Sequence, residues 1–94
     1  MRVSLQLFVT GRTPRSTRAV DNLRLLTDRY LPGQCDISII DITKDPAAAA
    51  AAQILATPTL IRPSPLPSRR VIGDLSDFER VATLLGLTSG RSQT

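Results

Sequence analysis

The sequence of 94 residues contains no histidine, a single cysteine and only three aromatic residues. Without histidine, the chain lacks the commonest general base and the commonest protein ligand of metal ions. Cys35 has no partner for a disulfide within the chain, so dithiol exchange is excluded and a reducing cytoplasm is the expected location. No apolar run approaches the roughly 20 residues of a membrane-spanning helix, and the first residues do not resemble a secretory signal.

The chain is rich in aliphatic residues and arginine instead. Hydrophobic residues make up 41% of the sequence, which is enough for the core of one domain. We expect this domain over residues 1–88 and a flexible tail over residues 89–94. The net charge is +4, and eleven of the twelve basic residues are arginine. A basic chain can bind nucleic acid or an acidic protein surface, but few aromatics are available for base stacking, which leaves nucleic acid as the minor alternative.

The first half of the chain predicts a parallel βαβ unit. Apolar residues alternate over 3–9, which is typical of a strand. Thr13 can cap a helix that begins at Pro14 and runs to about Tyr30. Residues 36–42 are rich in β-branched side chains and predict a second strand. The long helical connection between the two strands requires them to be parallel.

The second half predicts a short helix, two antiparallel strands and a last helix. Asp45-Pro46 is a strong helix start, and six alanines follow it before Thr57-Pro58 ends the helix. Residues 59–62 and 69–73 predict the two strands. A capping box of Ser76 and Glu79 begins the last helix. The resulting order βαβαββα is a thioredoxin-like α/β topology, with a mixed sheet and helices on both faces.

The chemistry of a working thioredoxin is missing from this topology. The loop before the first helix reads Gly11-Arg12-Thr13-Pro14-Arg15-Ser16 and carries no sulfur, whereas dithiol exchange needs Cys-x-x-Cys there. The acidic residues are scattered singly, and no glycine-rich phosphate loop occurs. We therefore expect a binding module without enzymatic activity, cofactor or metal.

Several blocks of the sequence resemble one family. They are Gly11-x-Thr13-Pro14-x-Ser16, Asp41, Asp45-Pro46, Ile54-Leu55-Ala56-Thr57-Pro58-Thr59-Leu60 and Arg69-Arg70-Val71-Ile72-Gly73-Asp74-Leu75-Ser76. Together they resemble the KaiB family of circadian clock proteins, from about Val3 to Leu87. The last two blocks, at this spacing, are the most specific.

The resemblance implies a choice between two folds. KaiB proteins adopt the thioredoxin-like form as a monomer that binds partners, or a ground-state βαββααβ form that is usually a homotetramer. The alanine run, the capping box and Leu84, where clock members often carry glycine, favour the thioredoxin-like form, since glycine within a helix costs about 1 kcal/mol. The residues expected to determine the fold are Pro58, Gly73, Ser76, Glu79 and Leu84, and the thioredoxin analogy suggests a cis bond at Pro58.

The resemblance also implies a function. KaiB proteins dock on the N-terminal ATPase ring of KaiC, sequester KaiA and displace the sensor domain of a clock-linked histidine kinase. By this analogy the expected partner-binding residues are Ile42, Lys44, Asp45, Ala48, Ala49, Ala52, Arg69 and Arg70. The two arginines are candidates for pairing with acidic partners, and an equally weighted alternative makes them solvated charges that discourage strand pairing at a sheet edge.

Two alternatives stay open because the sequence departs from clock members in its charge. The net charge is basic, and the last residues include Arg91 instead of an acidic tail. The chain could be a diverged paralogue that acts in a stress or signalling pathway with another partner. It could also be a basic thioredoxin-like module that binds protein or nucleic acid.

Overall fold

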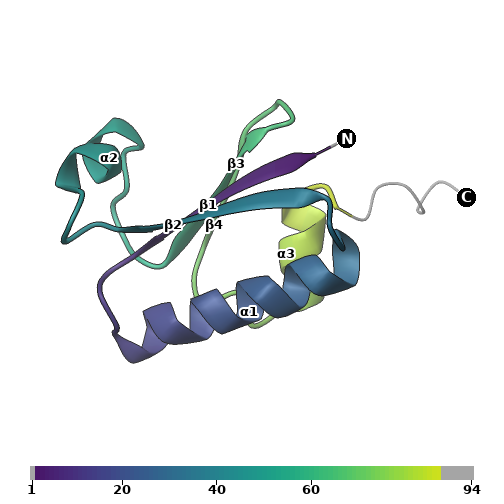
Figure 1. Ribbon diagram of the computed structural model, residues 1–94, viewed down its shortest axis with the longest axis horizontal. Helices are drawn as coiled ribbons and strands as arrows, with labels where there is room; N and C mark the ends of the chain where they lie inside the picture. Colours follow the sequence, from purple (N-terminus) through teal and green to yellow (C-terminus); the bar gives the residue numbers. More distant parts are fainter. Residues whose placement is uncertain (1, 88–94) are drawn as a thin grey trace, which may run out of the picture.

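The computed structural model describes residues 2–87, which form four strands and three helices in the predicted order (Figure 1). The expected tail over residues 89–94 lies outside the described residues. The elements are β1 (Val3–Val9), α1 (Pro14–Tyr30), β2 (Cys35–Asp41), α2 (Pro46–Ala51), β3 (Thr59–Ser64), β4 (Arg69–Ile72) and α3 (Phe78–Leu84). The predicted boundaries of β2 and β4 differ from these by one residue, and β3 extends two residues beyond its prediction.

The four strands form one mixed sheet in the order β2-β1-β3-β4. β1 is parallel to β2, with Leu5 opposite Ile37, so the predicted βαβ unit is confirmed. β3 is antiparallel to both β1 and β4, with Leu60 opposite Leu7 and Val71. β2 and β4 are the edge strands of this sheet, and β1 and β3 lie at its centre.

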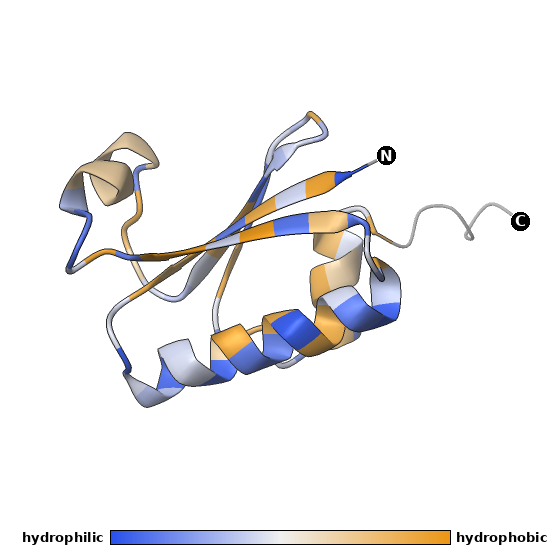
Figure 2. Cartoon of the chain, in the orientation of Figure 1, coloured by the Kyte–Doolittle hydropathy of each residue, from blue (hydrophilic) through white to orange (hydrophobic). Residues whose placement is uncertain are grey.

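One face of the sheet is covered by α1 and α3, which lie on the same side in Figure 1. Apolar and polar residues alternate along α1, whereas α2 is apolar along most of its length (Figure 2). Alternate residues of β1 meet one stripe of each covering helix, and burial of this apolar surface is the main favourable contribution to folding. The central residues of this core are Val3, Leu5, Leu7, Val9, Ala19, Leu23, Leu26, Leu60, Val71, Val81, Ala82 and Leu85.

The opposite face is covered less completely than the sequence predicts. Phe8 and Ile61 project from it and are buried, with exposed fractions of 2% and 6%, so this face is partly covered. However, α2 does not form a covering layer, because none of its residues is buried. It lies beyond one end of the sheet (Figure 1).

The predicted capping box at the start of α3 is wrong. The helix begins one residue later than expected, and the cap is Asp77, whose carboxylate accepts a hydrogen bond from the amide of Arg80 at 3.1 Å. The amide of Ser76 instead donates to Asp74 at 3.1 Å, which closes a turn before the helix. Glu79 therefore lies in the first turn, where a carboxylate favours the helix N-terminus.

The turn between β4 and α3 is tied to the start of β3. The Thr57-Pro58 peptide bond is cis, as expected. The carbonyl of Pro58 accepts a hydrogen bond from the amide of Gly73 at 2.9 Å. Gly73 has φ of +129°, a conformation that other residues rarely adopt, so this turn favours glycine.

Candidate protein-docking site

Two aspartates fix the loop that leads into α2. The carboxylate of Asp41 accepts hydrogen bonds from the Thr43 hydroxyl at 2.7 Å, the Thr43 amide at 2.9 Å and the Gly11 amide at 3.1 Å. These bonds stabilise the charged form and lower the pKa of Asp41, with the Thr43 hydroxyl as the largest cause. Asp45 caps the helix by accepting from the Ala48 amide at 3.1 Å, and Pro46 is the first helical residue, as predicted.

The end of α2 departs from the prediction. The helix stops at Ala51, before Thr57-Pro58, because Gln53 adopts a left-handed conformation with φ of +57°. A left-handed residue is a common way to end a helix, although glycine usually occupies the position. The guanidinium of Arg70 donates to the carbonyls of Ala52 at 2.7 Å and Gln53 at 3.1 Å. Arg70 thus connects β4 to the C-terminal end of α2.

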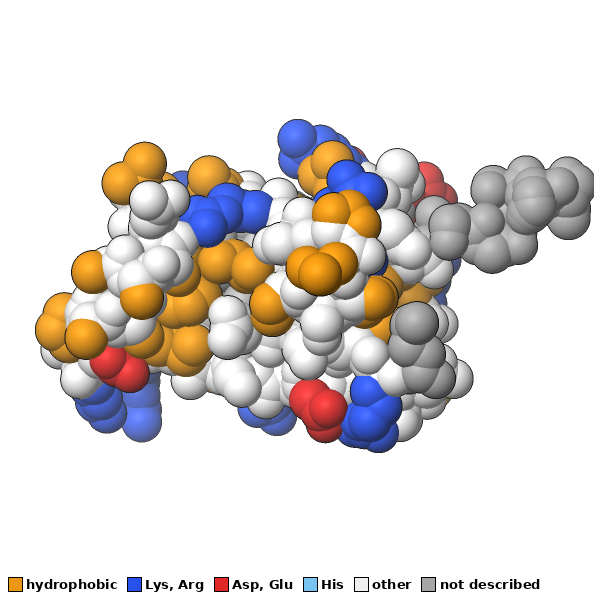
Figure 3. Space-filling model, turned by 90° about the horizontal axis from the view of Figure 1, so that it is seen from above, with side chains coloured by type: hydrophobic (Ala, Val, Ile, Leu, Met, Phe, Trp, Pro, Cys, Tyr) orange, Lys and Arg blue, Asp and Glu red, His pale blue; other side chains and the backbone are white. Residues whose placement is uncertain are grey.

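The outward surface of α2 is small, apolar and exposed. Ala47, Ala50 and Ala51 are exposed, and they share one side of the helix by their spacing. Leu55, shortly after the helix, is 95% exposed. Figure 3 shows apolar side chains gathered over the end of the molecule that carries α2. We call Ala47, Ala50, Ala51 and Leu55 the α2 face.

The predicted partner-binding residues only partly coincide with the α2 face. Lys44 and Asp45 are exposed beside it and Ile42 is half-buried, whereas Ala48, Ala49 and Ala52 form the half-buried side of the helix. The two arginines, Arg69 and Arg70, are also exposed but project to opposite faces of the sheet, because side chains alternate along a strand. Only Arg70 reaches α2.

The sequence predicts the helix as part of the interface but not which of its alanines face outward, for a physical reason. The side of a helix that faces the core is inferred from the contrast between its apolar and polar residues. Six consecutive alanines offer no such contrast. Sequence also does not reveal a row of side chains that crosses the second face of the sheet from edge to edge, formed by Ile40, Phe8, Thr59 and Ile72. That row follows from the strand register, which the sequence does not specify. Ile72 is 59% exposed at one end of the row.

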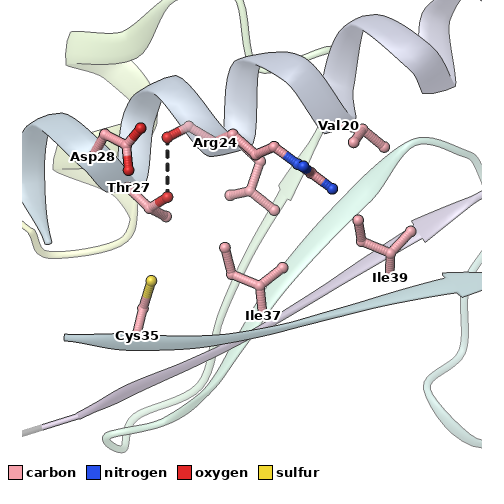
Figure 4. A pocket seen from close by; sticks show the side chains of 8 residues that line it. Val20, Arg24, Thr27, Asp28, Cys35, Ile37 and Ile39 are labelled. Atoms are coloured by element: carbon pink, nitrogen blue, oxygen red, sulfur yellow. Dashed lines mark hydrogen bonds between the residues drawn. The ribbon is translucent and has the colours of Figure 1, made fainter. Parts of the chain in front are cut away.

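A hollow lies between α1 and the edge strand β2. Figure 4 shows its lining residues: Val20, Ile37 and Ile39 are apolar, Arg24 and Asp28 are charged, and Cys35 projects from β2 towards the helix. Its volume is about 430 Å³. Cys35 is half-buried and its thiol is free.

Neither surface carries the constellation of a metal or redox site. Among residues 2–87, no group of three or more histidine, cysteine or carboxylate side chains could hold a metal ion. No helix in the same range is long and apolar enough to cross a membrane.

Comparison with proteins of known sequence places the chain in a family. The model of the KaiB domain matches residues 6–87. The circadian clock oscillator protein KaiB of Synechococcus elongatus is 45% identical over 89 residues, which are 95% of this chain and 87% of that protein. A KaiB of Prochlorococcus marinus is 49% identical over 83 residues, covering 88% of this chain and 68% of its own length.

Comparison with solved structures shows the fold. The N-terminal domain of Synechococcus elongatus SasA superposes with a TM-score of 0.75 at 21% identity, over 100% of this chain and 87% of that one. Mitochondrial thioredoxin 3 of Saccharomyces cerevisiae has a TM-score of 0.72 at 15% identity, over 93% and 77% of the two chains. The fold is thus thioredoxin-like. The sequence matches show that the chain belongs to the KaiB family of circadian clock proteins.

Proposed function

We propose that this protein is a non-enzymatic regulator that docks through the α2 face onto the N-terminal ATPase ring of a KaiC-type partner. Family membership supports the class of partner. The observation that carries the docking site is that α2, a helix of alanines with no buried residue, presents its exposed side to solvent. By the same family analogy, KaiA and a clock-linked histidine kinase are further partners.

The alanine composition of α2 makes the helix easy for a partner to cover, whereas it contributes no buried residue to the core. Alanine loses almost no side-chain entropy when it is immobilised, so a partner can cover this helix at low entropic cost. The helix carries no charged side chain that docking would have to desolvate. Apolar surface that a fold leaves exposed in one place often marks an interaction site.

The proposed contact residues are therefore shifted from those that the sequence suggested. Ala47, Ala50, Ala51 and Leu55 form the centre of the interface. Lys44 and Asp45 lie on its rim, where charges influence association rate and orientation more than affinity. The half-buried residues Ile42, Ala48, Ala49 and Ala52 support the helix from its inner side.

The test is a mixing experiment with a hexameric KaiC-type ATPase, followed by size-exclusion chromatography. The native chain is expected to co-elute with the ring, and the free chain to elute as a monomer. Ala50→Glu keeps a good helix former but places a charge in the apolar interface, so we expect at least a tenfold loss of affinity, as is typical of an unpaired desolvated charge. Leu25→Glu is the matched control, because Leu25 is an exposed apolar residue on α1.

Two results would contradict the proposal in different ways. If the native chain does not co-elute after several hours, the docking function itself is wrong, and the chain is a diverged member with another partner. If the native chain co-elutes and Ala50→Glu binds as tightly as Leu25→Glu, docking is right but the α2 face is not the interface.

A further inference from the structure

The position of α2 needs an explanation beyond packing. The helix spans six residues, and none of them is buried. Helices shorter than about 12 residues are marginal in water even when they are rich in alanine. Asp45 satisfies one amide at the N-terminus, so the C-terminal end needs a second anchor if α2 is to hold one orientation.

Arg70 has the geometry of that anchor. Its two terminal nitrogens donate to the carbonyls of two successive residues, Ala52 at 2.7 Å and Gln53 at 3.1 Å. A planar guanidinium can satisfy two neighbouring acceptors at once, which a lysine ammonium does less well. A cation at this place also complements the negative end of the helix dipole.

The residue that Arg70 holds is conformationally strained. Gln53 has φ of +57°, which is in the left-handed region. Residues other than glycine adopt this conformation at a free-energy cost and keep it only where the surrounding structure enforces it. The amide of Gln53 donates to Ala50 and its carbonyl accepts from Arg70, so the turn is held from both sides. Releasing Arg70 removes the interaction from outside the helix.

We propose that Arg70 is a positioning residue, which orients the α2 face by anchoring the C-terminal end of α2 to β4. It acts through the helix and does not contact the partner. The consequence for ring binding rests on the proposed function, but the ordering of α2 by Arg70 is a property of the free chain. This role differs from the pairing with an acidic partner that the sequence suggested for the same residue.

Arg69 lies outside the interface proposed above, so it provides a matched control for every measurement. It precedes Arg70 on the same strand, carries the same charge and is also exposed, but it projects to the other face. We would compare Arg70→Ala, Arg70→Lys and Arg69→Ala in the free chain by NMR. The readouts are the Cα secondary shifts and the ¹⁵N heteronuclear NOE of residues 50–54.

The expected result distinguishes anchoring of α2 by the hydrogen bonds of Arg70 from an effect of its positive charge alone. Both Arg70 variants should lose helical shifts and gain mobility at the end of α2, because lysine keeps the charge but not the fork of donors. Arg69→Ala should keep native values. In the ring-binding experiment, both Arg70 variants should lose affinity by about tenfold, in line with loss of charge-assisted hydrogen bonds, and Arg69→Ala should stay within about twofold.

Two outcomes would overturn the inference. Native shifts and NOE values in Arg70→Ala would show that α2 is ordered without the anchor. Equal loss of ring affinity in Arg69→Ala and Arg70→Ala, with native binding by Arg70→Lys, would show that Arg70 acts as a charge on the partner. If the native chain does not bind the ring at all, the proposed function fails, and the NMR comparison still decides the role of Arg70.

Discussion

Arg62 is a charged residue placed where charge is costly, and its replacement tests what holds α3 to the sheet. It projects from β3 into the covered side of the molecule and is only 6% exposed. Its guanidinium donates to the carbonyl of Leu85, at the end of α3, at 2.8 Å, and to the carbonyl of Pro67 in the β3–β4 loop. Its Nε is buried without a hydrogen-bond partner.

The magnitude follows from three contributions in Arg62→Ala. The buried carbonyl of Leu85 loses a charged donor, which costs about 1.5–3 kcal/mol. Removal of the aliphatic stem costs about 0.8 kcal/mol for each methylene group that leaves the core. The third contribution favours the variant. The native chain buries Nε without a hydrogen-bond partner, and removal of that cost stabilises the variant by about 1–2 kcal/mol. Two methylene groups are removed in Arg62→Ala, so we expect it to lose about 2 kcal/mol of unfolding free energy, and Arg62→Met, which keeps most of the stem, to lose about 1 kcal/mol.

The assay is equilibrium unfolding in urea with the midpoint and the slope fitted separately. A domain of this size unfolds in one cooperative step, and the midpoint should fall in both variants with little change in slope. Arg69→Ala, an exposed arginine on the neighbouring strand, should stay within about 0.5 kcal/mol of the native chain.

Arg62→Met gives the result that could refute the reasoning. If this variant is as stable as the native chain or more stable, burial of the guanidinium costs more than its two hydrogen bonds contribute. That outcome is well known for buried charges replaced by apolar residues. Arg62 would then not be a tether for α3, and its presence would need another explanation.

Two further predictions concern the pH dependence of stability and the helix propensity of α3. Asp41 has a lowered pKa in the folded chain, so its contribution is complete above the unfolded value near 4 and is lost as the pH falls through the lower folded value. Asp41→Asn should therefore reduce stability at pH 7 and flatten the fall in urea midpoint below about pH 4, and an unchanged acid profile would contradict this. Leu84→Gly should lose up to about 1 kcal/mol from helix propensity, the cost of glycine inside a helix, because Leu84 is the last residue of α3 and is 40% exposed. A neutral result in urea unfolding would remove Leu84 from the residues that favour this fold.

The parts of the fold that the sequence predicted are those with strong local signals. Thr13-Pro14 and Asp45-Pro46 start helices because a capping side chain and a preset φ act within a few residues. The α3 start was predicted one residue too early, because two potential caps, Ser76 and Asp77, stand side by side. The choice between them depends on Asp74, whose carboxylate already accepts from the Ser76 amide.

The candidate site was predicted less well, because its contacts join distant parts of the chain. Arg70 is 18 residues from Ala52, whose carbonyl accepts from its guanidinium. Neither the charge nor the spacing of the two arginines indicates which of them reaches the helix. The strand alternation that separates them depends on where β4 begins, and a shift of one residue would exchange their faces.

Arg62 and Arg70 share one arrangement, in which an arginine on a strand donates hydrogen bonds to the end of a helix. Arg62 and Arg70 lie on the neighbouring strands β3 and β4, project to opposite faces, and each donates to carbonyls at the C-terminal end of a different helix. A helix end of this kind leaves unpaired carbonyls that a cation satisfies well. The β3–β4 hairpin thereby makes hydrogen bonds to the C-terminal ends of both α2 and α3. A change in the register of this hairpin would move both arginines together, so the order of α2 proposed above and the packing of α3 should be lost in one step and not separately.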